Sequence, residues 1–218
     1  MTAVTANARA AFQSLSTDRP DVASARAVIR NLIRDSQDVS DIVRYMRALF
    51  RGDEPTRTPL NLNRIIEHAR ALLQAELEES NVEVIVLIDR KLPSPYGNEL
   101  QISQVLINLM RNAIEAMVEG CGQPRELTIK ARRNRRAICI EVADWGHGLP
   151  HLAGTRDSFV AIKTTGMGMG LKISQRIVEA HNGRLWAEPR DPRGTVFTMT
   201  LPLEGVESYE GPHNCLCA

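Results

Sequence analysis

The sequence predicts an α+β protein in which an all-helical N-terminal part is followed by a segment that mixes helices with strands. Apolar residues between positions 22 and 50 recur at nearly heptad spacing, which is typical of a long helix that packs against another helix. Residues 99–118 carry apolar side chains at i, i+3 and i+4, which predicts an amphipathic helix. Residues 138–144 alternate like a strand.

Composition limits the classes of protein to consider. The chain has 218 residues, of which 43% are hydrophobic and 24% charged, and a formal net charge of +1. Such a balance suits one or two small domains with a real core and gives no case for a nucleic-acid partner or a membrane surface. No apolar run approaches the length of a membrane span, no signal peptide is visible, and four scattered cysteines do not make a disulfide scaffold. We therefore expect a cytoplasmic protein with no nucleic-acid partner and no membrane contact.

Residues 1–51 are expected to form a helical hairpin. Residues 2–16 are rich in alanine and contain no helix breaker, and residues 17–21 are typical of a turn, with Asp21 as a candidate cap for a helix over 22–50. The apolar stripe of that helix consists of Val22, Ala25, Val28 or Ile29, Leu32, Val39, Ile42 or Val43, Met46 and Leu49. A hairpin cannot bury such a stripe alone, so we expect two copies to pair in a four-helix bundle.

The rest of the chain is expected to contain a charged linker at 52–59, a compact domain at 60–203 and a flexible tail at 204–218. The domain opens with a short strand at 59–62 and a helix at 64–79 that Asn63 can cap. Further strands are expected at 82–88, at about 127–132 and at 137–143, and a turn at 91–95. Four arginines lie where the last two strands connect, and we expect a solvated hairpin tip there, with a docking patch as the alternative: Arg132, Arg133, Arg135 and Arg136.

The helix over residues 99–118 carries two different stripes. Its apolar face consists of Ile102, Val105, Leu106, Leu109, Ala113 and Met117, and its polar stripe of Asn108, Arg111, Asn112 and Glu115. Asparagine is a mediocre helix former because its side chain competes for backbone hydrogen bonds, so two asparagines one turn apart are unusual. The stripe is either a solvated polar face or a pair of hard oxygen ligands suited to a magnesium ion that arrives with nucleotide phosphates.

Two later stretches contain candidate ligand-binding residues. Asp144 ends a strand and is followed by Gly146 and Gly148, so it is either an ordinary Asp-x-Gly turn or an acceptor for a planar donor such as the adenine amino group. Glycines at 166, 168 and 170 follow Lys163 and precede a helix expected at 172–180. That loop is either merely flexible or a phosphate site at a helix N-terminus.

In this order, these stretches resemble the ATP-binding domain of the sensor histidine kinases, within the wider family shared with gyrase, Hsp90 and MutL. The resemblance covers about residues 56–205 and includes several of the family's motifs. They are an asparagine box at 108–117, a first glycine box at 144–148, a degraded phenylalanine box at 159–163, a second glycine box at 166–171 and a closing hairpin at 180–186 and 194–202.

The resemblance implies the Bergerat fold, a two-layer α/β sandwich with a mixed sheet on one side and helices on the other, preceded here by the helical hairpin. It also implies the cofactors ATP and magnesium. Asp144 would take the adenine amino group with help from Thr195, while Asn108 and Asn112 would hold magnesium and phosphate. The whole set implied for nucleotide is Asn108, Arg111, Asn112, Asp144, Gly146, Gly148, Lys163, Gly166, Gly168, Gly170, Leu171 and Thr195.

Residues 18–51 resemble the dimerisation domain of FixL-like or nitrogen-regulatory-type kinases. In that family a phosphoacceptor His-Glu pair opens the first helix, shortly before a segment like residues 2–5. The five histidines of this chain lie elsewhere, at His68, His147, His151, His181 and His213. The resemblance therefore implies a homodimer that transfers the γ-phosphate of ATP to a histidine absent from these residues and that meets a response-regulator receiver domain. It assigns no catalytic residue within them.

The sequence departs from the family pattern in its lid and in its glycine box. The lid, residues 149–165, is short, has Ala161-Ile162 where two threonines are usual, and follows a glycine box that contains His147. In ATP-hydrolysing relatives such as gyrase, a water-activating glutamate stands at the position of Asn108. An amide is no general base, which favours transfer to histidine over hydrolysis.

Two other classes of protein remain to be weighed. A Rossmann dinucleotide enzyme could use residues 166–170, but their spacing is not G-x-G-x-x-G, no β-branched strand precedes them, and the two asparagines stay unexplained. A non-catalytic adaptor or pseudokinase that docks a response regulator agrees with the missing acceptor. The intact asparagine and glycine boxes argue against a complete loss of nucleotide binding.

Overall fold

The computed structural model describes residues 2–16, a subset of residues 20–36, and residues 57–120, 124–148 and 168–203. The chain divides into two compact units, residues 1–54 and 55–218, which are treated separately below.

The first unit begins with the predicted helix, α1 (Thr2–Leu15). The described residues between 22 and 36 are also helical. Asp21 caps this second helix as predicted, because its Oδ1 accepts a hydrogen bond from the Ser24 backbone N–H at 3.0 Å and its Oδ2 accepts one from the Ser24 hydroxyl at 2.7 Å. The remainder of the predicted hairpin lies outside the described residues.

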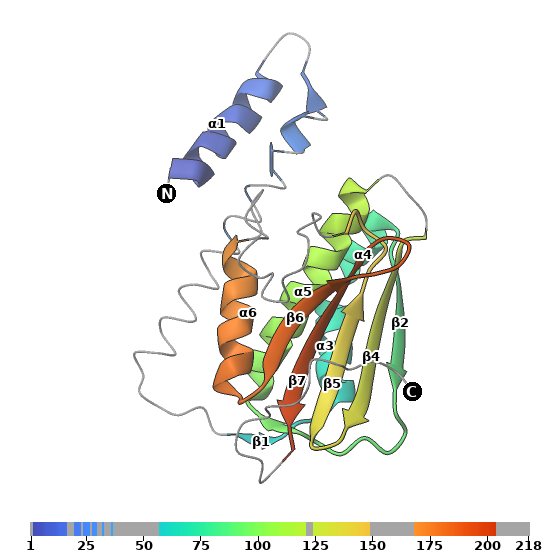
Figure 1. The fold of residues 1–218 in the computed structure, drawn as a ribbon. Coiled ribbons are helices and arrows are strands. Elements are labelled where there is room, and N and C mark those ends of the chain that lie inside the picture. Colours follow the sequence, from blue (N-terminus) through green and yellow to red (C-terminus); the bar gives the residue numbers. More distant parts are fainter. Residues whose placement is uncertain are drawn as a thin grey trace. The chain divides into compact units, whose positions relative to one another are not determined.

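The second unit is built on a five-stranded sheet (Figure 1). Its order is β2 (Glu83–Ile88), β4 (Glu126–Asn134), β5 (Ala137–Ala143), β7 (Thr195–Pro202) and β6 (Arg184–Pro189). The β2–β4 pair is parallel and the other pairs are antiparallel, so the sheet is mixed, as expected. Two short strands, β1 (Thr58–Pro59) and β3 (Tyr96–Gly97), pair separately.

Helices cover one face of this sheet, which confirms the two-layer sandwich (Figure 1). They are α3 (Leu62–Leu72), α4 (Gln74–Ser80), α5 (Glu99–Glu119) and α6 (Gly168–Ala180). Each of the six apolar residues predicted to form the buried face of α5 is at most 1% exposed. They pack against alternate residues of the central strands, which are Leu127, Ile129 and Ala131 of β4 and Ile138, Ile140 and Val142 of β5.

The start of this unit differs from the prediction. The helix expected at 64–79 is two helices, α3 and α4, separated at Leu73. Its cap is Asn61 rather than Asn63, since the Asn61 Oδ1 accepts a hydrogen bond from the Arg64 N–H at 3.1 Å. Leu62 is the first residue of α3 and is buried with its apolar face. The strand expected at 59–62 lies instead at Thr58–Pro59.

The second glycine box also differs from the prediction. We expected a helix from residue 172, preceded by a glycine loop, but α6 begins at Gly168. Gly168 and Gly170 thus lie in its first turn. Glycine has a low helix propensity, but Leu171 is 3% exposed in the core, and such packing overrides a weak local preference.

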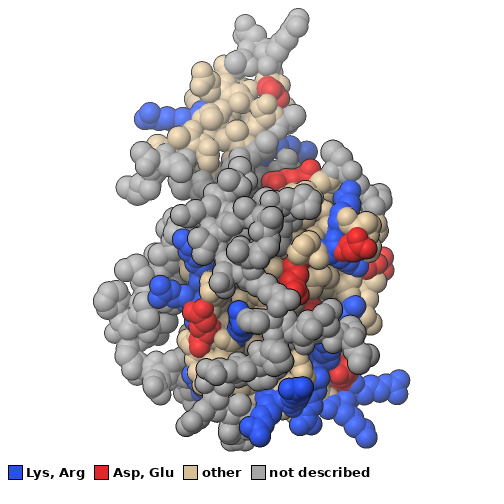
Figure 2. All heavy atoms as spheres, viewed as in Figure 1, with Lys and Arg blue, Asp and Glu red and all other residues tan. Residues whose placement is uncertain are grey.

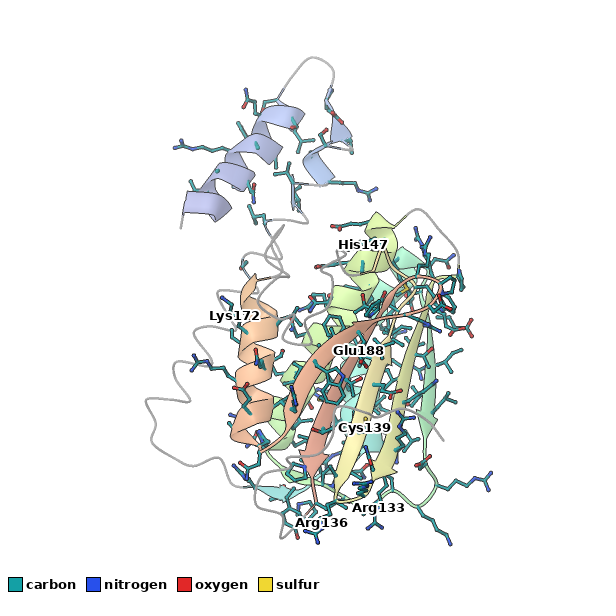
Figure 3. All side chains as sticks on the ribbon, viewed as in Figure 1. Arg133, Arg136, Cys139, His147, Lys172 and Glu188 are labelled. Atoms are coloured by element: carbon teal, nitrogen blue, oxygen red, sulfur yellow. The ribbon has the colours of Figure 1, made fainter. Side chains whose placement is uncertain are left out.

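The arginine-rich turn between β4 and β5 is a solvated tip, as predicted. Arg133, Arg135 and Arg136 are exposed, and Arg133 and Arg136 lie at one end of the sheet (Figure 3). Basic side chains gather at this end (Figure 2). Arg132 instead pairs with Glu141 across the two strands. Among the described residues, no helix is both long and apolar enough to span a bilayer.

A buried histidine connects the end of α6 to the start of α5. His181 is 2% exposed, its Nδ1 lies 2.7 Å from the Ile177 carbonyl oxygen, and its Nε2 lies 2.9 Å from the Asn98 backbone nitrogen. The Asn98 N–H can only donate, so Nε2 accepts and Nδ1 carries the proton that it donates to Ile177. Burial lowers the pKa of His181, which keeps this imidazole neutral.

The neutral form of His181 should make the stability of this unit depend on pH. Its pKa is about 6.5 in an unfolded chain and lower in the folded one. The unfolded state therefore binds more protons between these two pKa values. The contribution of neutral His181 to the free energy of unfolding should be fully present above pH 6.5 and should decrease as pH falls below it. Urea unfolding followed by tryptophan fluorescence at pH 7.5 and pH 5.5 measures the difference.

The His181→Gln variant should be less stable at pH 7.5 and should show a smaller loss between the two pH values. His68 lies on the exposed surface of α3, so His68→Gln is the matched control and should retain the full pH dependence. An unchanged pH dependence in His181→Gln would contradict the assignment.

Candidate functional site

The first asparagine of the predicted stripe lies where α5 packs against α6. Asn108 donates a hydrogen bond from Nδ2 to the Ser174 hydroxyl at 3.0 Å. A Cβ atom at Gly170 would come within 2.6 Å of the Asn108 Oδ1. Glycine in the first turn of α6 therefore leaves room for the Asn108 amide, which Ser174 then holds in place.

The second asparagine has a polar group without a partner. Asn112 is half-buried on α5, one turn after Asn108, and its Nδ2 is buried with no hydrogen-bond partner within the part of the chain that the structure describes. A buried donor without an acceptor costs free energy. A phosphate oxygen would supply that acceptor, and the oxygen of the same amide is a hard ligand of the kind magnesium prefers.

Arg111, between the two asparagines, points to a different partner. Its Nε and one terminal nitrogen each lie 3.3 Å from an oxygen of Glu76, in a bidentate ion pair that joins α5 to α4. A nucleotide contact of Arg111 was predicted from the resemblance, and it stays a prediction. The described contact gives this arginine a role in holding the helices.

Asp144 is the most deeply buried carboxylate of the predicted site, at 1% exposure, directly after β5. Its Oδ1 accepts hydrogen bonds from the backbone N–H groups of Gly146 at 2.7 Å and Thr195 at 3.2 Å. Its Oδ2 is buried and has no partner among the described residues. Burial raises the pKa of Asp144, although the two N–H groups and the charges of His147 and Arg190 oppose the shift.

An acceptor oxygen that is buried but unsatisfied indicates a missing donor. The adenine amino group is planar and uncharged, and it would donate a hydrogen bond to Oδ2. It would therefore satisfy this oxygen without bringing a second charge into the site. The residues present therefore fit the base that the resemblance implied.

The glycine turn after Asp144 packs tightly on the last turns of α5. A Cβ atom at Gly146 would lie 2.6–2.8 Å from the Cβ, carbonyl carbon and carbonyl oxygen of Ala116. That carbonyl also accepts a hydrogen bond from the His147 N–H at 3.3 Å. The His147 ring lies at this end of α5, with Nε2 3.7 Å from a Glu119 oxygen (Figure 3).

The other predicted site residues are placed as follows. Gly148 has a φ of +79° and is half-buried. Thr195 is 4% exposed and opens β7, where its carbonyl accepts the Asp144 N–H at 2.9 Å. Leu171 lies in the core. The structure thus brings Asp144, Gly146 and Thr195 together, and it brings Asn108 to Gly170. Lys163, Gly166 and the predicted lid lie outside the described residues.

Four residues at the site were not predicted. Ser174 fixes Asn108, and Glu76 fixes Arg111. Arg190 and Arg193, from the turn between β6 and β7, bond to the carbonyls of Asp144 and Trp145. The position of Ser174, one turn after Gly170, was visible in the sequence, but the other contacts depend on how distant elements meet.

The described residues contain no cluster of three or more His, Cys, Asp or Glu side chains that could hold a metal ion. The sequence implied Asn108 and Asn112 as magnesium ligands, and this assignment stays a prediction.

Comparison with known families places these residues in context. Residues 97–205 match the family described as histidine kinase-, DNA gyrase B- and HSP90-like ATPase. That range contains each of the boxes described above.

Curated relatives include two sensor proteins. The C4-dicarboxylate transport sensor protein DctS of Rhodobacter capsulatus is 39% identical over 151 residues, which are 68% of this chain and 23% of that protein. The sensor protein FixL of Bradyrhizobium diazoefficiens is 40% identical over 158 residues, which are 70% of this chain and 30% of that protein. The chain thus spans less than a third of the length of these relatives.

Among solved structures, the histidine kinase ThkA in complex with the response regulator protein TrrA has a similar fold. The TM-score is 0.67 at 24% sequence identity, over 92% of this chain and 57% of that chain. This likeness supports the fold described above.

The two close glycine contacts should respond differently to a methyl group. Gly146→Ala places Cβ against the Ala116 backbone, which cannot move without displacing α5, so it should lower the free energy of unfolding by about 1–3 kcal/mol. Gly170→Ala meets only the end of the Asn108 side chain. It should cost less stability and should weaken nucleotide binding by displacing that amide.

Urea unfolding and calorimetric titration with Mg-ATP measure the two effects. Arg176→Ala, on the exposed face of α6, is the control and should change neither. Equal losses of stability in the two glycine variants would show that the backbone contact at Gly146 is not special.

Proposed function

Because this chain belongs to the histidine kinase-, DNA gyrase B- and HSP90-like ATPase family and carries the catalytic ATP-binding domain of a sensor histidine kinase, we propose that it binds Mg-ATP at Asp144, Asn108 and Asn112. We propose further that it transfers the γ-phosphate to a histidine outside these 218 residues. The observation that carries the proposal is the Oδ2 of Asp144, which is buried and has no hydrogen-bond partner among the described residues.

The base side of the proposed site rests on Asp144. Its Oδ1 is held by two backbone N–H groups, so its remaining oxygen has a fixed direction. An acceptor in that place favours adenine over guanine, because the guanine ring presents a carbonyl oxygen where adenine presents its amino group. Two acceptors facing each other without a proton would leave both unsatisfied.

The phosphate side of the proposed site lies between α5 and α6. The first turn of α6 has backbone N–H groups without helical partners, and these favour phosphate. Asn108 borders that turn, and the buried Nδ2 of Asn112 has no acceptor in the part of the chain that the structure describes. When bound, a magnesium ion would neutralise phosphate charge, and Asn108 and Asn112 would be its protein ligands. Lys163 would add a positive charge from the lid.

The site supports transfer to an imidazole better than hydrolysis by water. Asn108 is an amide whose nitrogen donates to Ser174, and it cannot remove a proton from water. An imidazole nitrogen needs no such base. It attacks the γ-phosphorus in line while the bond to the bridging oxygen of ADP breaks, so catalysis depends on positioning and charge.

The proposal extends to two partners. Phe12 and Leu15 of α1 are 74% and 46% exposed, which leaves apolar surface for a second copy of the chain. ThkA, which shares the fold, has been solved in complex with a response regulator. We therefore propose a homodimer that acts on a receiver domain.

Replacing the base-binding carboxylate by its amide tests the binding proposal. Asp144→Asn keeps the acceptor that receives the Gly146 and Thr195 N–H groups and turns Oδ2 into a donor facing the adenine donor. ATP affinity should therefore fall by about 1–3 kcal/mol, measured by calorimetry in the presence of magnesium.

The same variant should not be less stable without nucleotide, because it removes a buried charge and keeps both backbone hydrogen bonds. Urea unfolding of the free protein checks that ATP affinity is lost at the site and not through unfolding. Equal affinity of the variant and wild type for ATP would contradict the adenine assignment.

Radiolabelled γ-phosphate tests the transfer proposal. The helical hairpin, where the family has its phosphoacceptor, contains no histidine, because the first histidine of the chain is His68. These 218 residues alone should therefore incorporate no acid-labile, base-stable phosphate. Adding a His-Glu segment before Thr2, or mixing with a subunit that carries one, should produce such label. Label on the chain alone would mean that one of its own histidines accepts phosphate, and ATP binding without any label in the mixture would indicate an adaptor.

A further inference from the structure

Two arginines of the turn between β6 and β7 converge on the backbone that carries Asp144. Arg193 donates from Nε and from a terminal nitrogen to the Trp145 carbonyl oxygen, at 3.1 and 2.8 Å. Arg190 donates to the Asp144 carbonyl oxygen at 3.3 Å. Both side chains are partly buried, so these charge-assisted hydrogen bonds are screened less than surface contacts are.

Arg190 also stacks on the indole ring of Trp145. Its guanidinium carbon lies 3.7 Å from the ring centroid, within the range of a cation–π interaction. The ring itself packs against the core, and its Nε1 is buried without a partner among the described residues. The residue next to Asp144 is thus held on its ring face by one arginine and at its carbonyl by the other.

The turn that supplies both arginines is fixed to the strand on which Thr195 lies. The Arg190 N–H donates to the Gly194 carbonyl oxygen at 3.0 Å. The residue after Gly194, Thr195, accepts the Asp144 N–H at its carbonyl oxygen and donates its own N–H to the Asp144 Oδ1. The arginines and the N–H group that orients the carboxylate therefore belong to one hairpin. A shift of this hairpin would move all of these contacts together.

We propose that Arg190 and Arg193 are positioning residues of the base site, which hold the Asp144–Trp145 backbone so that the Asp144 carboxylate keeps its direction toward adenine. This inference rests on the function proposed above. In this role neither arginine contacts the adenine base. Both act through the main-chain oxygens to which they bond, at the end of β5.

The two arginines differ in their effect on the charge of the carboxylate. Arg190 lowers the pKa of Asp144 through its positive charge, as does His147, whereas the larger effect of burial raises it. The other groups near them are the Gly146 and Thr195 N–H donors, Glu119 beside His147, and Glu126, whose charge acts on Arg190. Arg193 bonds one residue further along, to the Trp145 carbonyl oxygen, whereas Arg190 bonds to Asp144 itself.

This difference separates positioning from general stability. ATP binding needs the ionised carboxylate, so affinity falls as pH decreases through the Asp144 pKa. Arg190→Gln removes a charge that favours ionisation and should move this fall to higher pH. Arg193→Gln should weaken ATP binding without changing the pH at which affinity falls. Arg190→Lys keeps the positive charge and should keep the wild-type pH profile.

The experiment uses the 218-residue chain with Trp186→Phe, which leaves Trp145 as its one tryptophan. Calorimetry with Mg-ATP and Mg-GTP should show about tenfold weaker ATP binding for Arg190→Gln and Arg193→Gln, with a smaller preference for ATP over GTP. Arg190→Gln should also shift the Trp145 emission without nucleotide, because it removes the stacked cation. Arg133→Gln, at the exposed turn between β4 and β5, is the control and should leave every reading unchanged.

The outcomes distinguish this inference from the function on which it rests. A wild-type chain that binds no Mg-ATP overturns the proposed function and the inference with it. A wild-type chain that binds ATP, with both glutamine variants retaining its affinity and its preference over GTP, overturns the inference alone. If Arg193→Gln does not fold, Arg193→Lys and the pH profile of Arg190→Gln decide the question, and an unmoved profile counts against the inference.

Discussion

The buried carboxylate of Asp144 accepts two backbone hydrogen bonds through one oxygen and leaves the other without a donor among the described residues. A group of this kind lowers the stability of a domain unless surrounding structure compensates for it. Here the compensation comes from the Gly146 turn and the start of β7, which supply fixed dipoles, and from Arg190. The free protein thus holds an acceptor oxygen in place that only a hydrogen-bond donor can satisfy. A ligand with a donor at this point would be favoured over one with an acceptor, which would give the proposed site its specificity.

Helix α5 contacts the core, the neighbouring helices and the glycine turn after Asp144 through different parts of its surface. Its apolar face fills the core above the sheet, and its polar stripe faces α6 and α4 through Asn108 and Arg111. Its last turns receive the glycine turn at Ala116. A single helix therefore fixes both the base side and the phosphate side of the proposed site. Any change that shifted the core face would also displace the asparagines.

Part of the fold followed from periodicity in the sequence and part from the resemblance to a known family, which also supplied the predicted site residues. The six core positions of α5 and the strand β5 were predicted from periodicity, because burial imposes a repeating pattern on local sequence. The mixed two-layer sandwich was implied by the resemblance of the motifs to a known family. The helix cap expected at Asn63 and the helix start expected at residue 172 were wrong, because caps and first turns are decided by tertiary packing, which here buries Leu62 and Leu171. The contacts of Arg190 and Arg193 were missed for a related reason. Nothing local links residues 190 and 193 to residue 145, and only the pairing of β5 with β7 brings them together.

The contacts that hold α5 also bear on how such a site could catalyse. His181 ties the start of the helix to the end of α6, Ser174 ties its middle to the same helix, and Ala116 ties its end to the glycine turn. A helix held at three levels keeps its side chains in one geometry at little further cost in entropy when a ligand binds. Phosphoryl transfer gains most from such preorganisation, because its barrier is lowered by position and charge and not by covalent chemistry of the protein. Because α5 meets the glycine turn after Asp144 at one end and carries Asn108 in its middle, these contacts would preorganise both the base side and the phosphate side of the proposed site.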